Sequence, residues 1–190
     1  MGMASIFKSR KTDSLSSVLF FKDLGIDTFN TSNIYSDKMV SLIGNYRLDT
    51  IILVRGFGIL KEPILSSTKY GVLSYHHGDI QKYRGMPPGF WELYNGEKEM
   101  GVTVQILSEK LDGGKPIVQR QVLIDKSDSL ASLLKKAYSS SVNMMLKAVN
   151  KLENNEYEID SANHLGKVYT LPNFRQWFIL KVKLMHRKIF

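Results

Sequence analysis

Residues 50–54 form the stretch that most limits the folds open to this chain. They read Thr-Ile-Ile-Leu-Val, a continuous apolar run with the length of one β-strand. A strand with one solvent-facing side alternates apolar and polar residues, whereas a strand buried on both faces of a parallel sheet is apolar throughout. The run therefore predicts a buried strand in an α/β protein with a mostly parallel sheet and helices on both faces.

The other elements follow from residue type and spacing. β-branched and aromatic residues bounded by turn formers indicate strands, and apolar residues at helical spacing indicate helices. The predicted strands are residues 4–8, 26–29, 72–76, 101–107 and 116–124. The predicted helices are residues 18–24, 36–47, 90–94, 130–152 and 174–190, with Asp128 or Ser129 as the N-cap of the long fourth helix.

Composition narrows the class of protein. A chain of 190 residues with 43% hydrophobic residues is long enough to bury one core. The chain has no cysteine, which excludes disulfides and thiolate metal sites and suits a reducing compartment, so we expect a cytoplasmic protein. Its net charge of +8 suits an anionic substrate such as a nucleotide sugar or a phosphate ester.

Two adjacent histidines end the predicted strand over residues 72–76. Alternation puts Ser74 and His76 on one face and His77 on the other. If this strand and residues 101–107 are parallel neighbours, Asp112 in the following Leu-Asp-Gly-Gly turn approaches His76. An aspartate in that place would fix the tautomer of the imidazole and raise its basicity. The alternative is that Asp112 only shapes the turn and His76 is a capped surface residue.

Two other segments leave alternatives open. Arg55-Gly-Phe-Gly follows the apolar run, and it is either a loop that lets a ligand approach the main chain or a tight strand-to-helix turn. Arg84 either clamps a carboxylate or phosphate of a substrate or holds the carbonyls of a loop.

The C-terminal segment is basic and amphipathic. Residues 174–190 contain five Lys or Arg residues and no acid. Phe178, Val182, Met185 and Ile189 would share one face of a helix. The alternatives are contact with a membrane surface or polyanion, and docking of that apolar face on the chain's own domain. We therefore divide the chain into a main domain, residues 1–172, and a basic helix, residues 173–190.

The order of short motifs between residues 74 and 114 resembles the 10-formyltetrahydrofolate-dependent formyltransferases. The motifs are Ser-x-His at 74–76, Tyr-Arg-Gly at 83–85, Pro87, Trp91, Asn-Gly-Glu at 95–97, Gly-Val-Thr at 101–103 and Leu-Asp-x-Gly at 111–114. The resemblance covers roughly residues 15–150. It implies a Rossmann-like, three-layer α/β fold and an enzyme of one-carbon metabolism that needs no metal.

The resemblance also implies roles for individual residues. His76 and Asp112 take the places of the family's catalytic histidine and aspartate, and Ser74 takes the place of its catalytic asparagine. His76 would stabilise the oxyanion formed when an amine attacks the formyl carbon, while Asp112 would orient His76 and help to deprotonate the incoming ammonium. The residues implied in binding the folate co-substrate are Arg55, Gly56, Phe57, Gly58, Ile59, Leu107, Ser108, Glu109 and Leu111. His77 and Arg84 are implied in binding the amine substrate.

Two departures from the family pattern shape the functional expectation. Serine replaces the asparagine that donates to the oxyanion, and the opening strand beside residues 50–54 is not evident. Three alternatives could supply that strand. Met1 is not the natural start of the chain, residues 4–8 form the strand, or a partner chain or second copy provides it. Because no C-terminal barrel is evident either, we expect a small amine, such as an amino sugar or its nucleotide, and no nucleic acid. The alternative is a catalytically degenerate relative that binds a ligand or partner.

Overall fold

The computed structural model describes residues 4–8, 14–54, 57–157 and 164–189, and it divides into two compact units. The first unit is Met1–Leu73 and the second is Ser74–Phe190. The candidate catalytic residues all belong to the second unit.

The first unit opens with a parallel strand pair. Strand β1 (Ala4–Lys8) pairs with β2 (Asp27–Thr31), and helix α1 (Ser14–Asp23) connects them. Helix α2 (Asp37–Tyr46) follows and buries Met39 and Ile43 on its apolar face. Residues 4–8 thus form the predicted strand, but its hydrogen-bonded neighbour is β2, in a sheet separate from β3.

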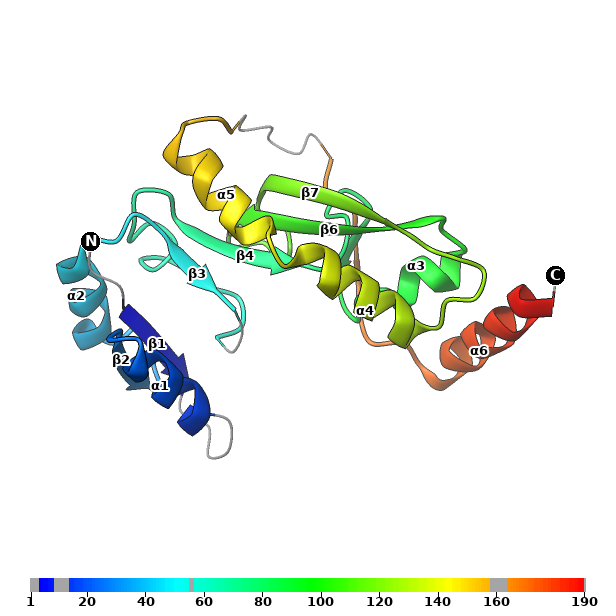
Figure 1. Ribbon diagram of the computed structural model, residues 1–190, viewed down its shortest axis with the longest axis horizontal. Helices are drawn as coiled ribbons and strands as arrows, with labels where there is room; N and C mark the ends of the chain where they lie inside the picture. The colour runs from blue at the N-terminus through cyan, green and yellow to red at the C-terminus, as the bar shows by residue number, and fades with distance from the viewer. Residues whose placement is uncertain (1–3, 9–13, 55–56, 158–163, 190) are drawn as a thin grey trace. The chain divides into compact units, whose positions relative to one another are not determined.

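Strand β3 (Ile51–Leu53) is less buried than its apolar sequence predicts. The side chain of Ile52 is 47% exposed and that of Val54 is 83% exposed. In the part of the chain that the structure describes, β3 stands at the end of a four-stranded sheet of order β3-β4-β6-β7 (Figure 1). The prediction of burial on both faces is therefore wrong for the described structure, because Ile52 on one face is exposed and Ile51 and Leu53 on the other face are only half-buried.

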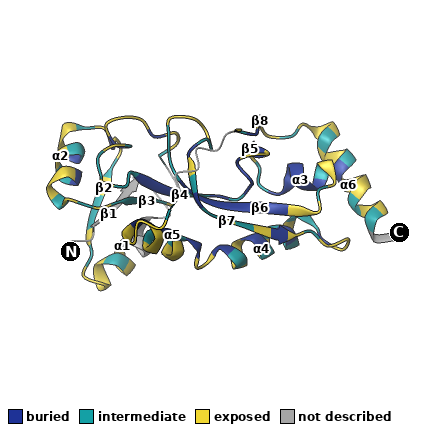
Figure 2. Cartoon of the chain, turned by 90° about the horizontal axis from the view of Figure 1, so that it is seen from above, coloured by how far each residue is buried: buried dark blue, intermediate teal, exposed yellow. Residues whose placement is uncertain are grey.

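The central strands carry the core. Strand β4 (Val72–His76) has the predicted bounds, and β6 (Glu99–Ile106) pairs antiparallel with β7 (Lys115–Leu123). The pairing shifts register at a bulge between Val104 and Gln105. Strands β4 and β6 are largely buried along their length (Figure 2).

Strand β6 begins beside the residues that follow β4. The hydroxyl of Thr103 donates to the carbonyl of Gly78 at 2.9 Å, and Gly101 lies so close to Asp79 that a Cβ on it would be 2.6 Å from the Asp79 nitrogen. The two neighbouring strands therefore run in opposite directions. Asp112 cannot reach His76 as the continuation of a parallel strand, so a different connection must bring them together.

Two helices replace the single helix predicted over residues 130–152. Helices α4 (Leu130–Ser141) and α5 (Met144–Glu153) both contact β6 and β7. Between them, the hydroxyl of Tyr75 donates to the carbonyl of Ser141 at 2.8 Å and accepts the N–H of Met145 at 2.9 Å. In an uninterrupted helix that N–H and that carbonyl would bond to each other, so the inserted hydroxyl explains the break. Ser129, one of the two predicted candidates, is the N-cap and accepts from the N–H of Ser132.

The remaining elements pack around helix α3 (Phe90–Asn95). Strands β5 (Tyr83–Gly85) and β8 (Lys167–Tyr169) form a parallel pair that the sequence did not reveal. Helix α6 (Phe174–Ile189) packs against α3 through Trp177, whose ring lies 4.6 Å from that of Phe90, and through Leu180, which is 2% exposed.

Helix α6 leaves the predicted apolar face uncovered. Phe178, Val182 and Met185 are 60%, 42% and 52% exposed. The helix therefore packs on the chain's own domain, as one alternative expects, but it does so through Trp177 and Leu180, while the predicted face stays largely exposed.

Candidate active site

His76 stands at the end of β4 with both ring nitrogens engaged. Its Nε2 lies 2.7 Å from the carbonyl oxygen of Tyr83, and its Nδ1 lies 3.4 Å from Oδ1 of Asp112. A carbonyl oxygen can only accept, so Nε2 carries a hydrogen and donates it. A hydrogen on Nδ1 faces a carboxylate, so the arrangement suits an imidazolium ring.

Asp112 is held in place by the segment that forms β5. Its Oδ2 accepts the N–H of Gly85 at 2.9 Å, and its backbone takes a positive φ of 41°. The guanidinium of Arg84 donates to the carbonyl of Leu111 at 2.6 and 2.9 Å and to that of Asp112 at 3.2 Å. The turn is therefore fixed to β5, and this connection brings the carboxylate to His76. Of the two alternatives for Arg84, the structure shows the contacts to loop carbonyls.

The electrostatics of the pair follow from these contacts. Burial alone would lower the pKa of His76, but the hydrogen bond and charge of Asp112, helped by the Tyr83 carbonyl and by Glu92, raise it above its ordinary value. Burial alone would raise the pKa of Asp112, but His76, the Gly85 N–H and Arg84 lower it. Both shifts favour the pair of an imidazolium and a carboxylate.

Gly78 allows this position of the imidazole. A Cβ on residue 78 would lie 2.4 Å from Nε2 of His76 and 3.0 Å from the carbonyl oxygen of Tyr83. The first distance is far inside van der Waals contact, so a side chain at this position would displace the ring. The glycine after the two histidines is needed for packing around His76.

Ser74 and His77, on either side of His76 in the sequence, face in different directions. Ser74 is half-buried, two residues before His76, on the same face of β4. His77 faces the other way, and its ring contacts those of Tyr75 and Tyr138 at centroid distances of 5.7 and 4.5 Å. Burial and the charge of His76 lower the pKa of His77, which favours a neutral ring.

The residues expected to bind folate fall in two loops, one in each unit. In the first unit, Arg55 and Gly56 lie outside the described residues, Phe57 is half-buried and Ile59 is 50% exposed. Gly58 has a φ of +73°, and nothing lies within 4 Å of the place where a Cβ would stand. The main chain at Gly58 is therefore open to close approach, and folate binding by this loop stays a prediction.

The second loop contains Asp112. Leu107 and Ser108 are half-buried, Glu109 is exposed and Leu111 is 40% exposed. The hydroxyl of Ser108 donates to the carbonyl of Gly113 at 3.0 Å, which helps to close the turn. These residues lie in the same loop as Asp112, and their role in folate binding stays a prediction. Within the described ranges, no group of three His, Asp or Glu residues is arranged to hold a metal ion.

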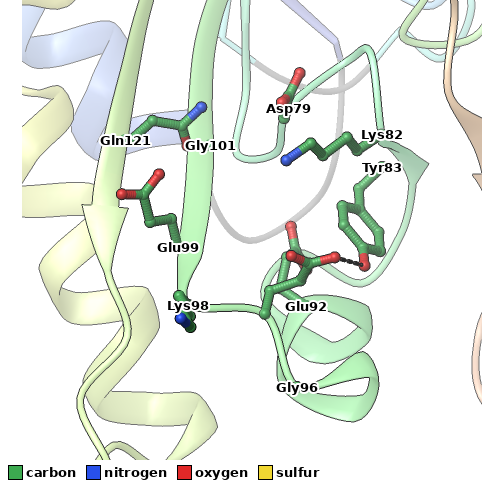
Figure 3. Close-up of a pocket in the computed structure, with 10 residues that line it drawn as sticks. Asp79, Lys82, Tyr83, Glu92, Gly96, Lys98, Glu99, Gly101 and Gln121 are labelled. Atoms are coloured by element: carbon green, nitrogen blue, oxygen red, sulfur yellow. Dashed lines mark hydrogen bonds between the residues drawn. The ribbon is translucent and has the colours of Figure 1, made fainter.

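Sequence reasoning missed Glu92 and the cavity beside it. A cavity of about 440 Å³ lies next to α3 and the start of β6 (Figure 3). Its charged side chains are those of Asp79, Lys82, Glu92, Glu97, Lys98 and Glu99. A narrower hollow holds His76, and Tyr83 and Glu92 line both spaces. The sequence did contain a signal for it, because Glu92 lies between Trp91 and Leu93 in an otherwise apolar turn.

The profile described as "Formyl transferase" matches residues 5–149 of this chain. A similar protein is the methionyl-tRNA formyltransferase of Prochlorococcus marinus (strain MIT 9515), which is 32% identical over 132 residues. That alignment takes in 70% of this chain and 40% of the relative, so the chain spans less than half the length of that relative.

Solved structures share the fold. A sugar N-formyltransferase from Shewanella sp FDAARGOS_354 gives a TM-score of 0.71 at 16% identity, over 94% of this chain and 74% of the other. A formyltransferase from Anoxybacillus kamchatkensis, solved with UDP-4,6-dideoxy-4-formamido-L-AltNAc and tetrahydrofolate, gives 0.67 at 16% identity, over 93% and 90%. The fold is therefore the Rossmann-like α/β fold that the sequence predicts.

Proposed function

Because this chain belongs to the formyl transferase family, we propose that it transfers the formyl group of 10-formyltetrahydrofolate to the amino group of a small substrate. The observation that carries the proposal is the 3.4 Å contact between the imidazole of His76 and the carboxylate of Asp112. The family profile spans both residues. The proposal places the reaction in the cytoplasm.

The proposed roles follow from charge. Attack of an amine on the formyl carbon puts negative charge on the formyl oxygen, and an N–H aimed at that oxygen stabilises the transition state. The Nε2–H of His76 donates to the carbonyl of Tyr83 in the structure, so the proposal requires the formyl oxygen to take the place of that carbonyl as the acceptor. Asp112 keeps the ring protonated and oriented. The ionised Asp112 is also the base nearest to His76 that can accept a proton from the incoming ammonium.

Ser74 is proposed as the second donor to the oxyanion, beside His76. Its hydroxyl is shorter than the asparagine side chain found at this place in the family. Loss of one oxyanion donor typically costs about 3 kcal/mol of transition-state stabilisation. We therefore expect turnover below that of a site with asparagine.

An amino sugar, free or linked to a nucleotide, is the proposed acceptor. Support comes from solved relatives whose names describe sugar N-formyltransferases, one of them bound to a UDP-linked formamido sugar. The net charge of +8 also favours an anionic nucleotide sugar. Methionyl-tRNA is the competing acceptor, because the similar Prochlorococcus protein bears that name.

The experiment is a formyl-transfer assay with 10-formyltetrahydrofolate and three acceptors: a free amino sugar, a nucleotide-linked amino sugar and initiator methionyl-tRNA. The product is a formamide, which mass spectrometry identifies. His76→Asn should abolish turnover, whereas His164→Asn, at an exposed histidine, serves as the matched control. Absence of turnover with every acceptor, together with no folate binding by calorimetry, would reject the proposal.

A catalytically degenerate binding protein is the second candidate, and Ser74 is the observation that favours it. Ser74→Asn separates the two. A rate increase of about 100-fold, equivalent to about 3 kcal/mol, supports an enzyme with a weakened oxyanion site. Folate binding without turnover, in both the parent protein and the Ser74→Asn variant, supports a binding role.

Helix α6 supports a further proposed contact, with an anionic membrane surface. The exposed apolar face of Phe178, Val182 and Met185 is accompanied by the exposed cationic side chains of Arg175 and Lys181. Sedimentation with vesicles of phosphatidylserine and phosphatidylcholine tests it. Phe178→Ser with Met185→Ser should reduce binding, and equal binding by this variant and the parent would refute the contact. Within the described ranges, no helix is long and apolar enough to cross a membrane.

A further inference from the structure

Glu92 is a buried acid beside the proposed catalytic pair. It lies in the first turn of α3, between Trp91 and Leu93, and is only 2% exposed. It lines the hollow that holds His76. Carboxylates are seldom buried without a compensating charge or hydrogen bond. The family motifs in this sequence do not include it, and neither role assigned above to His76 and Asp112 uses it.

We infer that Glu92 is a positioning residue of this site, a second counter-charge beside Asp112 that keeps the imidazole of His76 protonated. The two carboxylates approach from different elements. Asp112 comes from the turn after β6 and contacts Nδ1, whereas Glu92 comes from α3 and lines the hollow that holds His76. The importance of Glu92 for rate rests on the proposed function, but its effect on His76 does not.

The surroundings of Glu92 set its charge. On the side of the cavity, the charged or titratable groups are Asp79, Lys82, Tyr83, Glu97, Lys98 and Glu99. On the side of the hollow they are His76, His77, Arg84 and Tyr169. Burial raises the pKa of Glu92 to about 7, although its own N–H, the charge of His76 and the backbone of Gly89 act in the opposite direction. Glu92 therefore changes charge near neutral pH.

The position of Glu92 gives this ionisation a consequence. A carboxylate close to a buried imidazolium raises the pKa of the ring, and Glu92 contributes to the raised pKa of His76. Since Glu92 also lines the cavity of about 440 Å³, which is open to solvent, it can exchange its proton with water. As the pH rises, Glu92 gains its charge, and the proton on His76 is then held by two carboxylates instead of one.

The test is the titration of His76, followed by ¹⁵N-edited NMR of the imidazole rings in the full chain. The sequence has four histidines, so His76→Asn identifies the resonance. We expect Glu92→Gln to lower the pKa of His76. Glu99→Gln is the matched control, because Glu99 lines the same cavity, is exposed and undergoes the same loss of charge. Glu92→Asp keeps the charge but draws it back by one methylene, so it should lower the pKa of His76 measurably but by less than Glu92→Gln does.

Each outcome decides the inference. An unchanged or higher pKa of His76 in Glu92→Gln overturns it, and so does an equal decrease in Glu99→Gln. Should Glu92→Gln fail to fold, Glu92→Asp takes its place in the comparison. This variant draws the carboxylate back by one methylene. If the pKa of His76 is nevertheless unchanged to within error, a direct charge effect is refuted. These readings need no substrate, so they stand even if formyl transfer is not found. Where turnover is found, Glu92→Gln should move the alkaline limb of the kcat/KM profile to lower pH, and an unmoved limb would refute the link to rate.

Discussion

Asp112→Asn removes the charge that faces His76 while keeping the shape of the side chain. The Gly85 N–H, which donates to Oδ2 of Asp112 at 2.9 Å, will select the oxygen of the new amide. The amide NH₂ then faces Nδ1 of His76, which must give up its hydrogen. Because the Tyr83 carbonyl still requires the hydrogen on Nε2, the ring becomes the neutral Nε2–H tautomer.

The cost follows from the geometry. At 3.4 Å and an effective dielectric constant of about 20, the attraction between the two charges is about 5 kcal/mol. Removing one partner of a buried pair typically costs about 3–5 kcal/mol. Since Asp112 is 22% exposed, we expect the lower end, about 3 kcal/mol of unfolding free energy.

The pH dependence gives the sharper test. His76 has a raised pKa, so its contribution is complete below its ordinary value of 6.5 and is lost as the pH rises through the folded value. Asp112 has a lowered pKa, so its contribution is complete above its ordinary value of 3.8 and is lost as the pH falls through the folded value. The pair therefore stabilises the fold most between these two ordinary values.

Urea unfolding of the parent and Asp112→Asn at about pH 5.5 and about pH 9 measures this. We expect a loss of about 3 kcal/mol at the lower pH and a smaller loss at the higher pH, because the contribution of His76 is lost as the pH rises through its raised pKa. Glu109→Gln, an exposed change in the same turn, should have little effect at either pH. A loss that is equal at both values, or larger at the higher one, would refute the charge pairing.

Three other substitutions test the same region by urea unfolding. Gly78→Ala should cost about 1–3 kcal/mol and shift the NMR signals of His76, because the new methyl group occupies the place of its ring; unchanged signals would contradict the packing described. Tyr75→Phe removes the hydroxyl that bridges the break between α4 and α5 and should cost about 1–3 kcal/mol, whereas an unchanged midpoint would show that the helix closes without it. Arg84→Lys loses the planar set of donors to the loop carbonyls and should cost about 1–2 kcal/mol; unchanged stability with lost affinity for a nucleotide sugar would favour substrate binding by Arg84 instead.

The local features of the site were predictable from the sequence. Alternation along β4 placed Ser74 and His76 on one face and His77 on the other, because successive side chains of a strand point to opposite sides. The bounds of β4 and the N-cap at Ser129 also follow from neighbouring residues alone. The order of motifs from residue 74 to residue 114 identified the family, which the profile over residues 5–149 shows.

Other features depend on contacts between residues far apart in the chain. Residues 130–152 have helical spacing throughout, yet the hydroxyl of Tyr75, some 66 residues before Ser141, divides them into two helices. Residues 51–53 have the composition of a buried strand, but what packs on the two faces of the sheet decides how much of them is covered.

The sequence by itself determined which side chains share a face, because backbone geometry repeats over two residues in a strand and over about four in a helix. Only the tertiary structure decided how Asp112 reaches His76, since β6 runs opposite to β4 and the turn is fixed through Arg84 and Gly85. It also decided that Glu92 is buried beside them. The physical reason is that such contacts and burial depend on segments that are distant in sequence, and no local pattern records them.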